Sequence, residues 1–189
     1  MKTNLNYFYE NFPVVESDNI IMREVLPDDL KDLGECITDV EMYKYWGDNR
    51  STIEKNVIPY YKRVLEITPG EERKCIYWGI ALRENNKIIG QIWVNNIQNG
   101  RMGHIAYRIT RAFWNNGYAS EALKSIVKFC FEKTELKRLH TDVDIRNVAS
   151  CKVLEKCGFI KEGTVRQGKM GRSYCDYHIY SFIKSDYKK

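Results

Sequence analysis

The chain has 189 residues, of which 43% are hydrophobic and 29% charged, and we expect residues 1–189 to form one soluble domain with a sizeable core. The formal net charge of +5 is modest for this length and is compatible with an anionic ligand such as a nucleotide phosphate. It is too small for the basic stripe of a dedicated nucleic-acid-binding protein, so no stable nucleic-acid binding is expected.

The N-terminal residues and the cysteines predict a cytoplasmic protein that does not contact a membrane. Residues 1–16 contain no apolar run of signal-peptide length, and no segment approaches the ~20 apolar residues of a membrane span. The six cysteines form no CxxC pair and no zinc-like spacing, and HExxH is absent. We therefore expect reduced thiols and no metal.

Three elements are predicted before residue 70. Asn19–Val25 is typical of a strand, and a helix is expected from Asp28 to about Thr38. Ser51 and Glu54 have the form of a capping box, in which each side chain accepts a hydrogen bond from the other residue's backbone amide. A second helix should begin there and end before Pro69.

The next elements are strands joined by tight turns. Cys75–Arg83 and Lys87–Asn96 flank a predicted hairpin turn at Glu84–Asn86. The dipeptide at 99–100 is Asn-Gly, which predicts another hairpin before a strand at Gly103–Ile109.

The rest of the chain alternates helices and strands, and the predicted elements are a helix at about Tyr118–Lys133, a strand at Arg138–Ile145, a helix at about Ala149–Cys157, and strands at Phe159–Arg166 and Tyr174–Phe182. The last two strands should pair antiparallel around Gly171. This order predicts an α/β (α+β) fold with one strand–helix–strand crossover, rather than a doubly wound parallel sheet.

The segment Arg111–Ala122 lies between a strand and the long helix and is a candidate phosphate site. Gly117 and Ala119 allow close approach of a ligand to the backbone, and the unpaired amides of a helix N-terminus attract phosphate. A plain tight turn is the alternative interpretation. The absence of GxxxxGK[ST], and of GxGxxG after the first strand, disfavours a Walker-type NTPase or a Rossmann dinucleotide site.

Two stretches together resemble the GCN5-related N-acetyltransferase (GNAT) superfamily. They are most similar to its RimJ/RimL-like branch, which contains enzymes that acetylate ribosomal-protein N-termini. The branch patterns WGxGYAxEA and NxxSxxxxEKxGFxxEG correspond to Trp114–Ala122 and Asn147–Gly163, and an aspartate followed by a closing strand corresponds to Asp176–Phe182. The resemblance extends from about Asn19 to the C-terminus.

This resemblance implies a mixed, mostly antiparallel sheet of six to seven strands flanked by helices. It also implies an N-acetyltransferase that uses acetyl-CoA without a metal and transfers the acetyl group directly to a primary amine in a ternary complex. The acceptor would be a protein N-terminal amine or a small amine, and a homodimer is left open. A non-catalytic coenzyme-A-binding sensor is the alternative function.

The resemblance assigns coenzyme A binding mainly to backbone amides. The implied pyrophosphate-binding loop consists of Trp114, Asn115, Asn116, Gly117, Tyr118, Ala119 and Ser120, with N–H donors from Asn116 onward. The sequence departs from the family pattern at Trp114, where Arg or Gln is usual, and at Asn115, where the branch often has Gly. Ile109 matches the strand position that pairs with the pantetheine arm, and its amide is the implied oxyanion donor.

Further roles are implied on the helix that begins near Asn147. Asn147 matches the asparagine that binds the pantetheine arm, although helix N-capping alone would also favour this residue. Ser150 matches the hydroxyl that protonates the leaving thiolate, or is an ordinary first-turn residue. Lys152 and Lys156 are candidates to reach coenzyme A phosphates, or are simply solvated.

Two residues are candidates for the base that deprotonates the amine. His104 titrates in the useful range and Tyr107 lies on the same strand, but surface and core positions are the alternatives. We interpret His140 and His178 as structural. Lys169 stands in or near the place where some relatives have a carboxylate, which disfavours an identical base or substrate.

Three aromatic residues lie where the superfamily builds its acceptor wall, namely Tyr43, Tyr45 and Trp46. Packing in the core is the equally weighted alternative for them. Trp78 and Trp93 fall on adjacent predicted strands and are expected to fill the core.

Overall fold

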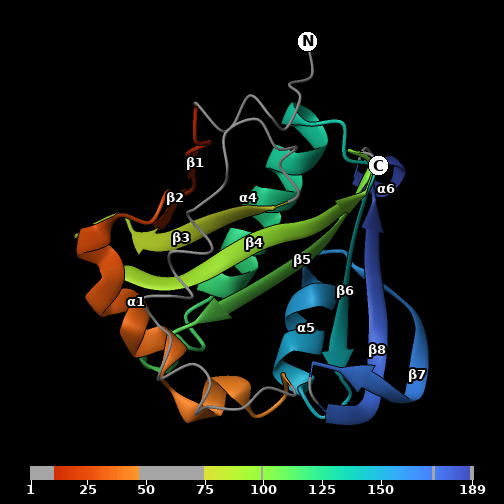
Figure 1. The fold of residues 1–189 in the computed structure, drawn as a ribbon. Coiled ribbons are helices and arrows are strands. Elements are labelled where there is room, and N and C mark those ends of the chain that lie inside the picture. The colour runs from red at the N-terminus through yellow and green to blue at the C-terminus, as the bar shows by residue number, and fades with distance from the viewer. Residues whose placement is uncertain (1–10, 47–74, 99, 172, 188–189) are drawn as a thin grey trace.

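The computed structural model describes residues 11–46, 75–98, 100–171 and 173–187, and an eight-stranded sheet dominates it (Figure 1). In spatial order the strands are β1 (Val15–Glu16), β2 (Ile20–Arg23), β3 (Ile76–Leu82), β4 (Ile88–Gln98), β5 (Met102–Ile109), β6 (Arg138–Asp144), β8 (Ser173–Ile183) and β7 (Ile160–Met170). Only β5 and β6 pair in parallel. The predicted mostly antiparallel sheet is confirmed.

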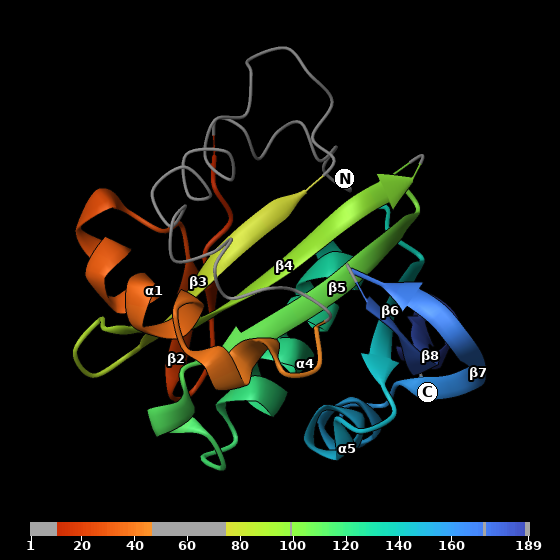
Figure 2. The same cartoon turned by 60° about the horizontal axis from the view of Figure 1, so that its bottom comes forward.

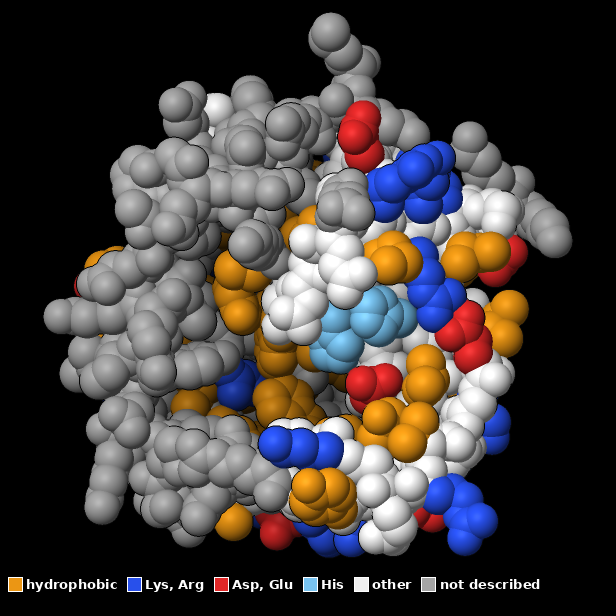
Figure 3. Space-filling view, turned by 45° about the vertical axis from the view of Figure 1, so that its right-hand side comes forward, with side chains coloured by type: hydrophobic (Ala, Val, Ile, Leu, Met, Phe, Trp, Pro, Cys, Tyr) orange, Lys and Arg blue, Asp and Glu red, His pale blue; other side chains and the backbone are white. Residues whose placement is uncertain are grey.

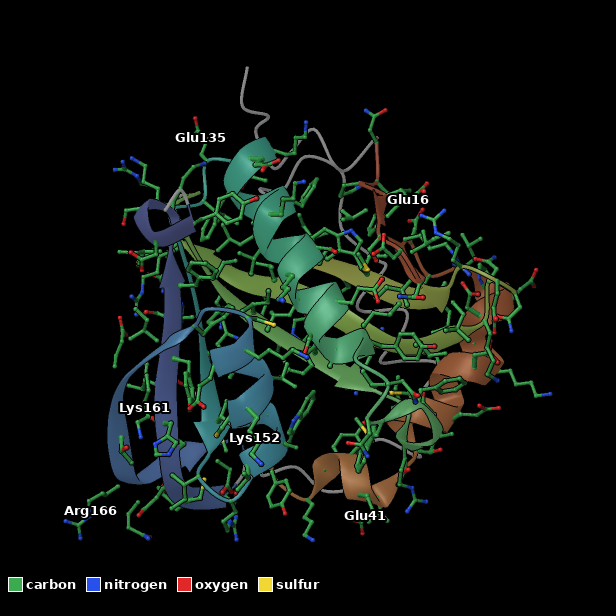
Figure 4. The ribbon with its side chains drawn as sticks, turned by 180° about the vertical axis from the view of Figure 1, so that it is seen from behind. Glu16, Glu41, Glu135, Lys152, Lys161 and Arg166 are labelled. Atoms are coloured by element: carbon green, nitrogen blue, oxygen red, sulfur yellow. The ribbon has the colours of Figure 1, made fainter. Side chains whose placement is uncertain are left out.

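The helices lie on the two faces of this sheet, and they are α1 (Leu30–Ile37), α4 (Tyr118–Lys133), α5 (Val148–Lys156) and α6 (Lys184–Tyr187), with short 3-10 turns at Pro27–Asp29, Val40–Tyr43 and Arg111–Phe113. α4 covers one face, behind the strands in Figure 1 and in front of them in Figure 4. Leu33 and Ile37 of α1 pack in a separate cluster with Val25. No helix in the described ranges is long and apolar enough to cross a membrane.

The predicted elements of the described ranges are present with small shifts. All the predicted strands form, and β1, whose two residues are too few to show an alternating pattern, is additional. The helix expected from Asp28 starts as a 3-10 turn and continues as α1. The predicted capping box at Ser51, the helix after it and residue 99 of the second hairpin lie outside the described residues.

The apolar residues of α4 recur at helical spacing and form its buried face. Six of them are buried: Ala122, Leu123, Ile126, Val127, Cys130 and Phe131. They pack against the β2–β5 side of the sheet in a cluster that includes Trp78, which is 0% exposed. This packing fixes the N-terminus of α4 beside the end of β5.

The sheet is split where the crossover occurs. β5 and β6 pair only over three residues, Met102–His104 with Arg138–His140, and then separate. Figure 2 shows β3, β4 and β5 running together while β6, β8 and β7 turn away. Beyond His104, β5 therefore pairs with a described strand only on its β4 side. We call the opening between the two strands the fork.

Close packing holds β5 to β4 along the fork. A Cβ atom on Gly90 would lie 2.3 Å from the Arg108 carbonyl oxygen, so only glycine fits at this position in β4. Gly90 faces Ile109 in the strand pairing. The C-terminal half of β5 is thus fixed on one side and open on the other.

Candidate active site

The exposed edge of β5 presents backbone amides to the fork. The Thr110 amide donates to the Ile89 carbonyl at 2.7 Å, and in an antiparallel pair the direction of the backbone groups alternates from residue to residue. The N–H and C=O groups of Ile109 and Tyr107 therefore point away from β4. In agreement, the Ile109 carbonyl accepts a hydrogen bond from the Trp114 indole at 2.6 Å.

The loop between β5 and α4 is closed by Trp114 and two left-handed residues. Asn115 has φ +63° and Gly117 has φ +84°. Asparagine tolerates this region better than most residues, which explains why it can replace the glycine that the family often has there. The indole of Trp114 ties the loop to the end of β5. Both departures from the family pattern are thus compatible with an ordered loop.

The N-terminus of α4 leaves several backbone donors without helical partners. The first helical hydrogen bond runs from the Glu121 amide to the Gly117 carbonyl, so the amides of Tyr118, Ala119 and Ser120 precede it. Gly117 is the N-cap and has no side chain to occupy them. The structure therefore groups the predicted pyrophosphate donors at the end of β5.

Glu121, in the first turn of α4, is held away from this site. Its carboxylate accepts hydrogen bonds from the Ser17 hydroxyl at 2.7 Å, and from the backbone and side chain of Asn19 at 2.8 and 3.0 Å. Burial opposes its charge, but these bonds outweigh burial and lower its pKa. The contacts dock α4 on the turn between β1 and β2.

Ser150 and Tyr107, two of the three predicted catalytic residues, meet across the fork. The Tyr107 phenol lies 3.1 Å from the Ser150 hydroxyl, with one side chain from β5 and the other from α5. Burial raises the pKa of Tyr107 far above its ordinary value, which keeps the phenol protonated. The pair can therefore donate a proton or a hydrogen bond within the fork.

Asn147 is the N-cap of α5. Its side-chain oxygen accepts a hydrogen bond from the Ser150 backbone amide at 3.2 Å, which fixes the first turn of the helix and the position of Ser150. Lys152 and Lys156 are exposed on the same helix. Figure 4 shows Lys152 on α5, whereas Lys161 and Arg166 lie out along β7, so these basic residues form no continuous patch.

His104 lies apart from this pair. Side chains alternate across a strand, so His104 and Tyr107 occupy opposite faces of β5. The His104 ring packs edge-to-face on His140, with the ring centroids 5.5 Å apart. Burial, then the charge of His140, lowers the pKa of His104, whereas Asp142 acts in the opposite direction.

The same face of the sheet carries a buried arginine that sequence reasoning missed. Arg108 is 4% exposed, and its guanidinium donates to the Tyr43 hydroxyl at 3.0 Å and to the Gln91 side chain. Its central carbon lies 5.4 Å from the Trp93 ring and 5.7 Å from the Trp46 ring. Figure 3 shows a hollow on this face, with hydrophobic and Lys or Arg side chains within it and histidine beside it.

The aromatic residues expected at the acceptor wall separate into two places. Trp46 packs on both Tyr43 and Trp93, forming one cluster around Arg108. Tyr45 instead lies 6.0 Å from the guanidinium of Arg146. Side chains alternate along β5, so Arg108 lies on the opposite face from the buried Ile109. A charged residue at this position of a strand is the signal in the sequence that could have identified Arg108.

A small pocket of about 260 Å³ lies beside Arg146, between the end of β6 and the β7–β8 hairpin, and is lined by Ile145, Arg146, Gln167, Tyr174, Cys175 and Asp176. Asp176 accepts a hydrogen bond from the Gln167 amide at 2.8 Å and so holds the bulge of β7. Buried Asp144 pairs with Arg146 at 2.5 Å. Across the described ranges no group of three or more His, Cys, Asp or Glu side chains could hold a metal ion.

Comparisons with known proteins agree with this architecture. Residues 19–160 match the family model of the acetyltransferase (GNAT) domain. A Bacillus subtilis (strain 168) protein named uncharacterized N-acetyltransferase YoaA is 32% identical over 179 residues, covering 92% of this chain and 98% of that protein. The ribosomal-protein-serine acetyltransferase of Escherichia coli (strain K12) is 23% identical over 138 residues, covering 72% of this chain and 70% of that protein.

Solved structures share the fold. An acetyltransferase of the GNAT family from Bacillus anthracis has a TM-score of 0.79 at 20% identity, covering 92% of this chain and 99% of that one. A spermidine N-acetyltransferase from Vibrio cholerae, in complex with CoA and spermine, has a TM-score of 0.76 at 16% identity, covering 90% and 98%. Because the family match spans well over half of the sequence, the chain belongs to the GNAT acetyltransferase family.

Proposed function

We propose that the protein transfers the acetyl group of acetyl-CoA to a primary amine by direct attack in a ternary complex. The observation that carries this proposal is the fork itself, which has backbone amides that point away from β4 on one side and the Tyr107–Ser150 pair across it. The α4 N-terminus lies at the end of the same strand. An extended thioester and its phosphates would thus meet donors along one continuous line.

The chain supplies binding groups for coenzyme A from its backbone. The amides from Asn116 to Ser120, at and before the N-terminus of α4, would hold the pyrophosphate. The amides of Tyr107 and Ile109 would pair with the pantetheine arm where β6 has turned away, with the Ile109 amide as oxyanion donor. Asn147, Lys152 and Lys156 would add contacts from α5.

The reaction moves one proton from the amine and returns one to sulfur. As the amine nitrogen bonds to the acetyl carbon, His104 would accept the amine proton. The carbon–sulfur bond then breaks, and the thiolate would take a proton from the Ser150 hydroxyl, which Tyr107 holds in place and which regains a proton from solvent. The two proton-transfer groups lie on opposite faces of β5, as expected when the leaving group and the amine occupy opposite sides of the reacting carbon.

The acceptor is proposed only as a primary amine, either a protein N-terminus or a small amine. The relatives include a ribosomal-protein-serine acetyltransferase and a spermidine N-acetyltransferase, so the family likeness supports both classes. The hollow around Arg108 and the aromatic cluster is the surface on which these acceptors would be distinguished.

The test is thiol release from acetyl-CoA with a panel of peptides, polyamines and antibiotics. Gly117→Arg places a bulky side chain in the phosphate loop and should abolish turnover. Gly100→Arg is a matched control because Gly100 also has positive φ (+64°), and a Cβ atom at either glycine would meet nothing within 4 Å. Tight coenzyme A binding without turnover across the panel would favour the sensor function, and no binding would refute both.

A further inference from the structure

His104 and His140 face each other where the fork closes. They are partners in the last residue pair that joins β5 to β6. Their rings are nearly perpendicular, at 80°, with centroids 5.5 Å apart. From the sequence we interpret His140 as structural, but its strand position makes it a titratable neighbour of the candidate base.

Both rings have an unsatisfied nitrogen. The Nδ1 atoms of His104 and His140 are buried, and neither has a hydrogen-bond partner within the described part of the structure. Buried polar atoms are nearly always paired, so two unpaired ring nitrogens side by side call for a functional explanation. By contrast, Nδ1 of His178, the third histidine, lies 2.8 Å from the Thr164 hydroxyl.

The surrounding charges keep both rings neutral. For His140, burial and then Arg138 lower the pKa, whereas Asp142, Glu162 and the Gly103 backbone raise it without prevailing. For His104, burial and His140 lower the pKa, and Asp142 opposes them. Because each protonated ring disfavours the other, the pair takes up one proton more readily than two.

We propose that His104 and His140 form a two-histidine proton acceptor at the closed end of the fork. This inference rests on the proposed function. His104, on the strand that borders the thioester site, takes the proton released by the amine as the carbon–nitrogen bond forms, and later returns it to solvent. His140 is a positioning residue that orients the His104 ring and keeps it neutral.

The distances suit this assignment. His104 and Tyr107 are three positions apart, which is about 10 Å along a strand. Because the side chains project to opposite faces, the amine, the reacting carbon and the sulfur fit between them, with one bridging water if needed. A base adjacent to Ser150 would instead compete with the leaving thiolate for the same proton.

The experiment combines the pH profile of kcat/KM with NMR titration of the three histidine rings in the full chain. A base must be neutral to act, so activity falls as pH drops through the pKa of His104. Replacing His140 by Asn removes the neighbouring ring that competes with His104 for one proton, which raises that pKa. We expect His140→Asn to move both the acidic limb of activity and the His104 ring titration to higher pH.

Two further variants sharpen the test. His140→Lys places a fixed positive charge beside His104 and should move the limb to lower pH. His104→Asn should lower kcat/KM by about 10²- to 10⁴-fold and remove the limb. His178→Asn is the control and should leave the profile unchanged. Thermal unfolding of each variant, with His104→Gln as a second replacement, separates loss of the base from loss of the fold.

The results distinguish this inference from the proposed function. If the wild-type protein turns over an amine but His140→Asn does not shift the acidic limb, or His104→Asn keeps full activity, the proposal of a histidine pair is overturned. The proposed acetyltransferase function would then stand. Wild-type protein that turns over no amine would overturn the proposed function. In that case the ring titrations would still show whether the two histidines are coupled, and uncoupled rings would overturn the pair as well.

Discussion

Removing either hydroxyl of the Tyr107–Ser150 pair should slow the chemical step without weakening acetyl-CoA binding. The two oxygens are 3.1 Å apart, and no phosphate-loop amide is involved. A proton-transfer group contributes about 10²- to 10⁴-fold, and a thiolate, with a pKa of about 8.5, is already a good leaving group. We therefore expect Ser150→Ala and Tyr107→Phe each to lower kcat by about 100-fold, with little change in KM for acetyl-CoA.

The cost in stability should be smaller and unequal. Ser150→Ala leaves the buried Tyr107 hydroxyl facing only the Ser150 carbonyl, at 3.5 Å, and should lower the free energy of unfolding by about 1–3 kcal/mol. Tyr107→Phe removes the buried hydroxyl itself and should cost about 0.5–1.5 kcal/mol. The cap of α5 survives in both because Asn147 accepts from the Ser150 backbone.

A double-mutant cycle measured by single-turnover kinetics and urea denaturation tests this reasoning. If the two hydroxyls act as one unit, the double variant should lose about as much kcat as either single variant. Ser125→Ala on α4 and Tyr187→Phe on α6 are matched controls away from the fork. Multiplicative losses in the double variant, or a Ser150→Ala enzyme within twofold of wild type, would refute the pair's role.

Three other perturbations follow from contacts within the fold. Gly90→Ala places a Cβ atom 2.3 Å from the Arg108 carbonyl oxygen and should lower the free energy of unfolding by about 2–3 kcal/mol. Gly34→Ala, in open space on α1, should instead raise the free energy of unfolding by up to about 1 kcal/mol. Equal free energies for the two variants in urea denaturation would contradict this. Trp114→Phe removes the 2.6 Å hydrogen bond to the Ile109 carbonyl and should raise KM for acetyl-CoA about two- to twelvefold at unchanged kcat in steady-state assays. An unchanged KM would show that this hydrogen bond does not hold the loop for acetyl-CoA binding. Hydrogen bonds from Arg138 and Ser181 lower the pKa of Glu162 from 4.5 to about 2. The stabilising effect of the Glu162 carboxylate is therefore complete above pH 4.5 and is lost as pH falls toward 2. Glu162→Gln should flatten that part of a plot of Tm against pH, and an unaltered acidic part of the plot would show that the ion pair is irrelevant.

The fold was largely predictable because its elements carry strong local patterns. The apolar face of α4 and the alternating strands follow from the spacing of apolar residues. What the sequence does not encode locally is pairing: the fork depends on β6 leaving β5 after three residues and joining β8. β1 and α6 were missed because two and four residues are too short to show a period.

The candidate site was predicted in parts rather than as an assembly. Family motifs indicated the phosphate loop and α5, and the structure places both at the fork. The contact between Tyr107 and Ser150 joins residues 43 positions apart, so no local pattern could reveal it. Arg108 could have been singled out by the alternation along β5, but its partners Tyr43 and Gln91 lie elsewhere in the chain and could not.

Amide hydrogen exchange with and without acetyl-CoA, resolved by residue, tests the central claim most directly. If the thioester occupies the fork, the amides of Tyr107, Ile109 and the first turn of α4 should exchange more slowly when acetyl-CoA is present. The Thr110 amide, already bonded to Ile89, should change little. Saturating acetyl-CoA that protects other amides and leaves those of Tyr107 and Ile109 unchanged would contradict the account.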